Sequence, residues 1–390
     1  MKKLRYCIVI IFLIIILSPI LLITAKKLQL TKHSFGGNLS GYFDSHKKIE
    51  YSKKTFLNRE YQNKFEEYIN STIPLRGYYI RLFKQLQFTF FKLSTSIIGK
   101  NTNLFEISYI NVECGLDPQF DYSIPEKYSE LKDYVKQLET LQKNLKKINK
   151  DFLFYITPSK ANVNYDDIPD KYRNKKAIDY IPPYFYLKKL LSETDINYID
   201  SRDYFFKEGI PAFYKTGIHW SRPVEQKVSK EIVDRLSIIS NKNLPKIELK
   251  ELKTSNTPIK RDADLFNLDN VIINPHGTYY EYETNYIIDE NYYKPKFLIQ
   301  GGSFSDGFYK YDYADFADES YKIFYELILR DKAGNQKKIT SWEDIDFTDI
   351  LNQIDFVIIE VNEAAIPYYS SNFAGYLNNI LDTYTPDSKK

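Results

Sequence analysis

The chain has 390 residues, of which 43% are hydrophobic and 27% are charged, a composition typical of a globular protein. This length exceeds that of one minimal domain and allows a large domain together with an accessory region. The formal net charge of +3 is too balanced to predict nucleic-acid binding, so we expect no nucleic-acid partner.

An uncharged apolar segment, residues 7–25, lies near the start of the chain behind the basic stretch MKKLR. At about 1.5 Å per residue, it is long enough to cross a hydrocarbon core about 30 Å thick. It is longer than the apolar part of a cleaved signal peptide, and Ile23-Thr24-Ala25 is a poor cleavage site. We therefore expect residues 1–27 to be an uncleaved membrane anchor. No second apolar run follows, and for a bacterial signal-anchor the rest of the chain is then expected outside the cytoplasm.

The next part of the chain changes composition. Residues 28–95 begin with a polar, Gly/Ser-containing stretch and continue with helical spacing that Pro74 interrupts, which predicts a stalk and a helical lead-in. Residues 96–390 are expected to form the main domain. Within it, residues 240–290 are polar and irregular, and they are predicted to be an insertion with hairpins.

Short apolar strands alternate with amphipathic helices through the main domain. Apolar residues recur at spacings of three and four over residues 125–149, which predicts a helix, and the apolar run 152–156 after it predicts a buried strand. The same reading gives further strands at 196–199, 296–300 and 354–361, and further helices at 184–191, 223–236 and 373–381. This alternation predicts an α/β fold with a parallel sheet covered by helices on both faces. In such sheets functional residues gather at the carboxyl ends of the strands.

One strand end carries a candidate nucleophile. Strand 296–300 runs into Gly301-Gly302-Ser303, where glycines permit a tight turn and the serine hydroxyl is presented beside backbone N–H groups. That arrangement serves a nucleophile and part of an oxyanion hole, although Gly/Ser turns after strands are also common in purely structural roles.

A serine nucleophile needs a base, and the chain has four histidines. His33 and His46 lie in the expected stalk, and His276 lies in an Asn-Pro-His-Gly turn. His219 lies between a loop and a predicted helix start, next to Trp220, and is the best candidate. A buried or surface histidine with an ordinary hydrogen bond is the alternative.

Taken together, the ordered motifs resemble a known family. The stretches are GKNTNLFE, YITPSKANVNYDDIP, KTGIHWS, FLIQGGSFSDG and FVIIEVNE, in that order. They resemble the SGNH-hydrolase-like domain of the alginate O-acetyltransferase family, of the AlgX and AlgJ type, and the related family named for its DHHW motif. The resemblance covers residues 60–385 in pieces. It implies an SGNH-hydrolase-like, flavodoxin-like sheet in residues 96–390, preceded by a membrane anchor.

The resemblance also implies a catalytic triad, in which Ser303 is the nucleophile and His219 the base. The family places the triad aspartate two residues before the histidine, where this chain has Gly217. The aspartate of the family's Gly-Asp-Ser-Phe motif is likewise replaced, by Gly302. Three acids near expected strand ends are candidates for the third triad member: Asp200, Asp306 and Glu363.

Four further residues are candidates for contacts with the oxyanion or the substrate. They are Gly302, Lys160, Trp220 and Asn362, each of which could equally be an ordinary structural residue. No metal-binding spacing, phosphate loop or dinucleotide fingerprint occurs, so we expect no metal and no cofactor.

These observations predict a membrane-anchored, extracytoplasmic O-acyltransferase, in the first place an O-acetyltransferase, that modifies a cell-surface or secreted polysaccharide through an acyl-serine. By analogy with the family, a multi-span membrane acyltransferase partner would supply the acyl group. Two alternatives remain at this point: a carbohydrate esterase with the same residues, and a non-catalytic polysaccharide-binding or assembly protein with a degenerate site.

Overall fold

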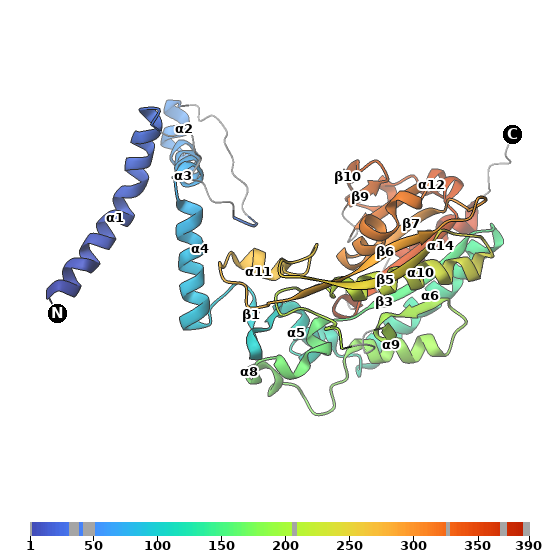
Figure 1. The fold of residues 1–390 in the computed structure, drawn as a ribbon. Helices are drawn as coiled ribbons and strands as arrows, with labels where there is room; N and C mark the ends of the chain where they lie inside the picture. Colours follow the sequence, from blue (N-terminus) through green and yellow to red (C-terminus); the bar gives the residue numbers. More distant parts are fainter. Residues whose placement is uncertain are drawn as a thin grey trace. The chain divides into compact units, whose positions relative to one another are not determined.

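The computed structural model describes residues 2–30, 39–41, 51–204, 209–324, 328–366 and 373–384 (Figure 1). The chain divides into two compact units, which are described separately. The first comprises residues 1–95 and 266–274, and the second comprises residues 96–265 and 275–390. His33 and His46 fall outside the described residues.

The first unit is helical. Its helices are α1 (Lys2–Lys27), α2 (Lys53–Leu57), α3 (Glu60–Thr72) and α4 (Arg76–Leu86), followed by a π-helical turn, Gln87–Phe91. Helix α3 ends before Pro74 and α4 begins after it, because proline cannot continue the hydrogen-bond ladder. In α1, the segment Val9–Lys27 is predominantly apolar and long enough to span a membrane, and none of it is buried. It fits either a signal-anchor or a signal sequence.

The second unit contains a seven-stranded, mostly parallel sheet, which confirms the predicted fold class. Its strands are β3 (Asp151–Thr157), β4 (Tyr198–Asp200), β7 (Lys296–Gly301), β8 (Glu319–Phe324), β9 (Ile328–Asp331), β10 (Gln336–Lys338) and β11 (Phe356–Asn362). Their order across the sheet is β10-β9-β8-β7-β11-β3-β4. The pairs from β8 to β4 are parallel, and β9 and β10 extend the sheet antiparallel. Strands β8, β9 and β10 were not predicted from the sequence.

The parallel strands follow a circularly permuted flavodoxin-like order. If β7, β8, β11, β3 and β4 are numbered one to five, their order across the sheet is 2-1-3-4-5. This is the flavodoxin-like order. The chain, however, enters this sheet at its fourth strand, β3. In sheets of this order the ligand site lies at the carboxyl ends of the first and third strands, which here are β7 and β11.

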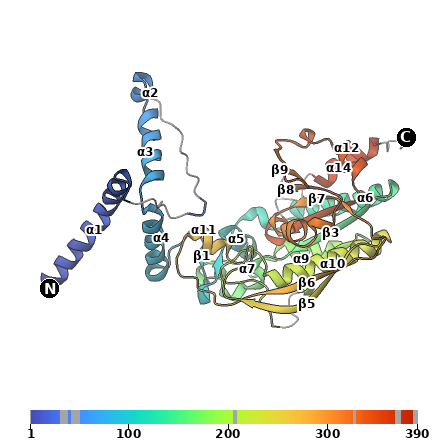
Figure 2. The same ribbon diagram turned by 45° about the horizontal axis from the view of Figure 1, so that its top comes forward.

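Helices cover both faces of the sheet, and β3 shows why (Figure 2). Its side chains alternate, so Phe152, Phe154 and Ile156 point to one hydrophobic cluster and Leu153 and Tyr155 to another. The first cluster contains residues of α6 (Pro125–Lys147), α9 (Pro183–Ser192), α12 (Phe347–Gln353) and α14 (Phe373–Thr383). The second contains residues of α10 (Arg222–Ser240).

Residues 240–290, predicted to be an insertion with hairpins, contain β5 (Lys246–Ser255), α11 (Asp264–Asp269) and β6 (Tyr279–Ile287). Strands β5 and β6 pair antiparallel. The Gln226 amide of α10 donates to the Tyr282 carbonyl at 2.8 Å and accepts from the Tyr282 N–H at 2.8 Å. The hairpin therefore lies on α10, on the face of the sheet away from α6.

Shorter elements complete the second unit: β1 (Ile97–Ile98), β2 (Leu104–Phe105), α5 (Ile107–Cys114), α7 (Lys160–Val163) and α8 (Asp170–Arg173). Cys114 is a buried, free cysteine in α5. Its burial raises the pKa of the thiol to about 11, so the sulfur is an unreactive packing group.

Candidate active site

Ser303 lies at the carboxyl end of β7, at the start of a 3-10 turn, Ser303–Ser305. Neither glycine before it has a positive φ, so conformational freedom is not why they are there. A Cβ on Gly301 would lie 2.7 Å from the Cβ of Glu360 on the neighbouring strand β11. Gly301 thus permits close approach of the two strands that flank the expected ligand site.

His219 lies in the loop between β4 and α10 and is 8% exposed. A β-bridge between Phe213 and Trp220 closes this loop. The Nε2 atom of His219 lies 2.6 Å from the Oγ of Ser303, within hydrogen-bond distance. The structure therefore brings together the nucleophile and base that the sequence suggested.

Asp264, the first residue of α11, is the acid that holds His219. Its Oδ2 lies 2.5 Å from His219 Nδ1, and its Oδ1 accepts the N–H groups of Ile218 at 2.8 Å and of Leu265 at 2.9 Å. Burial opposes ionisation of Asp264, but these hydrogen bonds and the His219 charge outweigh it and lower the pKa of the carboxyl. Ser303, His219 and Asp264 thus form a continuous hydrogen-bonded chain.

The position of Asp264 depends on the absence of a side chain at Gly217. A Cβ on Gly217 would lie 2.8 Å from the backbone oxygen of Asp262, a distance that side chains do not tolerate. The glycine leaves room for the backbone of Arg261 and Asp262, which precedes Asp264 in the chain. The acid bonded to His219 therefore comes from position 264, and Gly217 leaves the space that the residues before Asp264 occupy.

We expect Gly217→Ala to lower kcat about 10- to 100-fold, because the added methyl group pushes the backbone of Arg261 and Asp262 and so shifts the nearby Asp264 away from His219. Gly277→Ala is the matched control, since a Cβ there meets nothing within 4 Å. Hydrolysis of 4-nitrophenyl acetate by both variants measures the effect. Equal kcat values for the two would contradict the link between Gly217 and the acid.

The three acids considered from the sequence are engaged elsewhere. Asp306 pairs with Lys310 at 2.8 Å and with the buried Lys322. Asp200 accepts from Tyr184 at 2.6 Å and from Lys188 at 2.5 Å. Glu363 holds the Arg202 guanidinium through both carboxylate oxygens and accepts the Ser159 N–H at 3.1 Å. In this structure, the acid bonded to His219 is Asp264 and none of these three.

Lys160 is buried beneath the loop that carries His219. Its ammonium donates to the carbonyls of Tyr214 at 2.8 Å, Lys215 at 3.1 Å and Gly217 at 2.7 Å. These bonds use all three donor hydrogens, so the group has none left for a substrate. Burial lowers the pKa of Lys160 to about 7. Lys160 therefore positions the loop and does not take the substrate-binding role that the sequence suggested.

Trp220 and Asn362 are also structural. Trp220 is 3% exposed, packs edge-on against Phe304 at 5.4 Å and belongs to the cluster under α10, so it offers no face to a sugar. The Asn362 amide donates to the carbonyl of Pro158 at 2.9 Å and accepts the Ala364 N–H at 3.0 Å, which closes the end of β11. Sequence position at a strand end did not reveal which way these side chains point.

Gly302 is similarly occupied. Its N–H donates to the buried Glu360 carboxylate at 2.5 Å, and its carbonyl accepts from Lys322 at 3.0 Å and from the Ser305 hydroxyl at 2.7 Å. The Gly302 N–H is therefore not available to an oxyanion. These three bonds fix the backbone immediately before the nucleophile.

Arg261 is a second residue that sequence reasoning missed. One guanidinium nitrogen donates to the Ser303 carbonyl, and another donates to Glu225 at 2.7 Å. Burial opposes ionisation of Glu225, but the charges of Arg261 and Arg222 outweigh it and lower its pKa. Arg261 and Asp264 lie on one short segment, so this segment holds both the nucleophile's backbone and the base.

Among the described residues, no group of three His, Cys, Asp or Glu side chains is arranged to hold a metal ion. The Ser303 Oγ lies against His219, which can act as a base, and Asp264 orients the His219 ring. Such a set supports nucleophilic attack by serine on an acyl carbon.

No protein-family model matches the sequence, and no curated protein matches it. Among solved structures, the chain is similar to the O-acetyltransferase domain of Pseudomonas putida AlgJ, with 12% identity and a TM-score of 0.42, over 73% of this chain and 98% of that one. It is similar to Pseudomonas aeruginosa AlgX, with 15% identity and a TM-score of 0.39, over 76% and 68%. It is also similar to a DHHW family protein from Eubacterium siraeum, with 10% identity and a TM-score of 0.36, over 66% and 89%.

These are the two groups that the motifs resemble. At identities of 10–15%, these similarities concern the fold and do not assign an activity to this chain.

Proposed function

We propose that this chain is a membrane-anchored, extracytoplasmic serine O-acetyltransferase that modifies a polysaccharide. The observation that carries the proposal is the hydrogen-bonded chain from Ser303 Oγ through His219 to Asp264. Two features of the sequence support the finer points. The ordered motifs resemble O-acetyltransferases of polysaccharides, and the apolar residues 7–25 suit a membrane anchor.

In the first half-reaction, Ser303 Oγ attacks the carbonyl carbon of an acetyl donor while its proton passes to His219 Nε2. Asp264 stabilises the imidazolium that forms and holds its Nδ1–H. The carbonyl oxygen gains the negative charge. We assign its stabilisation to the Phe304 N–H, because a helical turn leaves its first N–H groups unpaired and this one follows the nucleophile. The bond to the leaving group then breaks, and the leaving group takes the proton from His219.

In the second half-reaction, a sugar hydroxyl attacks the acetyl-serine. His219 Nε2 accepts the hydroxyl proton and returns it to Ser303 Oγ as the serine ester breaks. The acetyl group is then an ester of the sugar, and the free enzyme is restored. Water in place of the sugar would give hydrolysis with the same residues.

A cavity between the start of α10 and the β5–β6 hairpin offers a place for the acceptor. It has a volume of about 390 Å³ and is lined by Tyr282, Tyr286 and Tyr311 together with charged side chains. The Tyr311 ring lies 5.8 Å from the guanidinium carbon of Arg261, whose nitrogen donates to the Ser303 carbonyl. Tyrosine rings can stack on sugar rings. Tyr282 is buried and the Tyr286 ring packs on Phe316, so we assign to Tyr311 the sugar contact that Trp220 cannot make.

The acetyl donor is proposed to reach Ser303 from a multi-span membrane acyltransferase partner, as in the resembled family. An anchor at residues 7–25 would keep the second unit near such a partner.

The test uses the full chain in detergent with 4-nitrophenyl acetate as donor, followed by intact-mass and peptide mass analysis. We expect a fraction of the chain to gain the mass of one acetyl group on Ser303, and we expect an added oligosaccharide to shorten the lifetime of this adduct and become acetylated. Catalysed hydrolysis without any acetylated oligosaccharide would favour the esterase alternative. If no adduct forms and Ser303→Ala equals the wild type in release of nitrophenol, the chain is not a serine acyltransferase.

A further inference from the structure

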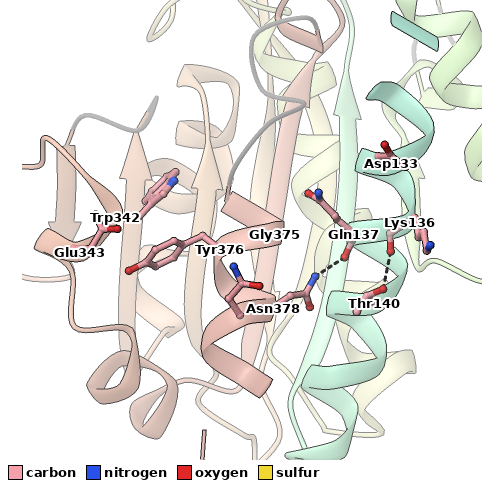
Figure 3. Close-up of a pocket in the computed structure, with 10 residues that line it drawn as sticks. Asp133, Lys136, Gln137, Thr140, Trp342, Glu343, Gly375, Tyr376 and Asn378 are labelled. Carbon is pink, nitrogen blue, oxygen red and sulfur yellow. Dashed lines mark hydrogen bonds between the residues drawn. The ribbon is translucent and has the colours of Figure 1, made fainter. Parts of the chain in front are cut away.

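A cleft separate from the triad lies between α6, α14 and the 3-10 turn Trp342–Asp344 (Figure 3). Its volume is about 660 Å³. None of its lining residues belongs to the Ser303 site, because α6 and α14 cover the face of the sheet opposite α10. Nothing in the proposed acyl transfer uses this cleft.

One wall of the cleft is aromatic. The rings of Trp342 and Tyr376 lie with centroids 6.3 Å apart and planes inclined at 34°. The indole of Trp342 also packs at 5.5 Å from Phe373 and at 6.3 Å from Phe347, which fixes its orientation. The chain has only two tryptophans, and this one lines a cleft, unlike the buried Trp220.

The α6 side of the cleft is polar, and hydrogen bonds within α6 and from α14 hold it in place. The Asn378 amide donates to the backbone carbonyl of Gln137 at 3.0 Å, and the Thr140 hydroxyl donates to the Lys136 carbonyl at 2.9 Å (Figure 3). Among the residues that the structure describes, Gln137 Oε1 is buried without a hydrogen-bond partner. A Cβ on Gly375 would lie 3.0 Å from that oxygen, so the glycine leaves space for the amide.

Aromatic rings facing polar side chains are suited to binding a carbohydrate. Sugar rings stack their apolar C–H faces on aromatic side chains, and their hydroxyl groups bond to planar amides and carboxylates. Amide and carboxylate groups of this kind line the cleft at Asn379, Asp133 and Glu343, which are exposed. The charged groups of the lining are Asp133, Glu343 and Lys136, two acids and one base. That balance disfavours a polyanion.

We propose that this cleft is a second carbohydrate-binding site, which takes a short stretch of uncharged hexose or N-acetylhexosamine residues. Its biological meaning rests on the proposed function, in which the acceptor is a polysaccharide. A polymer held at the cleft would have its other hydroxyl groups at a raised local concentration near the triad. The cleft thus accounts for polymer retention without any further contact at Ser303.

The test is isothermal titration calorimetry with the full chain in detergent, in a Ser303→Ala background that prevents turnover. The probes are cellopentaose and chitopentaose as uncharged chains and pentagalacturonate as an anionic one. We expect at least one uncharged pentasaccharide to bind and the anionic one to bind at least about 10-fold more weakly. Trp342→Ala should weaken binding about 10-fold, the value of a lost ring-stacking contact.

Because Trp342 also packs against Phe347 and Phe373, a second variant leaves the core intact. Thr140→Trp places an indole in the cleft from the exposed side of α6, and Lys143→Trp places one on the same helix outside the cleft. We expect Thr140→Trp to lower the affinity at least about 10-fold and Lys143→Trp to leave it unchanged. Equal affinities for these two variants, tighter binding of the anionic probe, or no binding of either uncharged probe would overturn the proposal.

The same variants separate this site from the triad. In the Ser303-containing chain, Thr140→Trp should leave hydrolysis of 4-nitrophenyl acetate unchanged and reduce acetylation of a polymer. Binding at the cleft by a chain that forms no acetyl-serine would refute the proposed function and support the cleft. Acetyl-serine formation with no pentasaccharide binding would support the proposed function and refute the carbohydrate site in the cleft.

Discussion

Replacing Ser303 with alanine is expected to lower kcat for 4-nitrophenyl acetate by about 10⁶-fold, the size of the loss when the nucleophile of a serine triad is removed. The physical reason is that the remaining groups can only bind the ester and stabilise its oxyanion. His219→Ala should fall by a similar factor, since its Nε2 lies 2.6 Å from Ser303 Oγ and accepts the proton. The double variant should lose no more than either single one, because the two residues act as a unit.

Ser305→Ala is the matched control for that experiment. Ser305 lies in the same turn, is buried, and donates its hydroxyl to the Gly302 carbonyl at 2.7 Å. Its loss should cost about 1 kcal/mol of folding free energy and change kcat less than about tenfold. Activity of Ser303→Ala within about tenfold of wild type would exclude Ser303 as the nucleophile.

Asp264→Asn is expected to lower kcat/KM about 10⁴-fold, with the fold intact. An amide of nearly the same shape no longer stabilises the imidazolium, and it can donate to Nδ1 and so favour the wrong tautomer of His219. The ionised form of Asp264 is the one that acts, and the lowered pKa keeps it ionised through neutral pH. Ester hydrolysis as a function of substrate concentration measures the loss, and circular dichroism checks the fold.

The comparison variants replace the three acids that the sequence offered as the third triad member. Asp306→Asn leaves the buried Lys322 without its carboxylate and should therefore lower the melting temperature. Its kcat/KM, measured well below that melting temperature, should stay within about tenfold of wild type. A 10⁴-fold loss at Asp306, Asp200 or Glu363, with Asp264→Asn active, would reassign the acid.

Motifs pointed to Ser303 and His219, the proposed nucleophile and base, but not to Asp264, which is bonded to His219. Ser303 and His219 each lie in a recognisable local pattern, a strand end with glycines and a His-Trp pair before a helix. Asp264 lies in a stretch read as irregular insertion, among other acids, and only the tertiary fold brings it to His219. The signal that was present in the sequence was Gly217, whose missing side chain marks the space that the acid-bearing segment fills.

The parallel sheet could be predicted because its central strands are continuous apolar runs, as Phe356–Asn362 shows. Strand Glu319–Phe324 was missed because its sequence, ESYKIF, mixes polar and apolar residues in a way that does not exclude a loop. The direction of side chains at strand ends could not be predicted either. Lys160, Trp220 and Asn362 all occupy plausible site positions, yet each is buried in contacts with the protein itself.

The permuted strand order has a consequence for the folding of this protein. Among the described strands, β11 comes last in the sequence, and it pairs with β3 on one side and β7 on the other. The half of the sheet with β3 and β4 leads to His219, and the half with β7 and β8 leads to Ser303. Because contacts between distant parts of the chain form slowly, we expect the insertion of β11 between the two halves to be a slow step of folding. We therefore expect Ser303 and His219 to come together only after β11 has been synthesised and has paired with both neighbours.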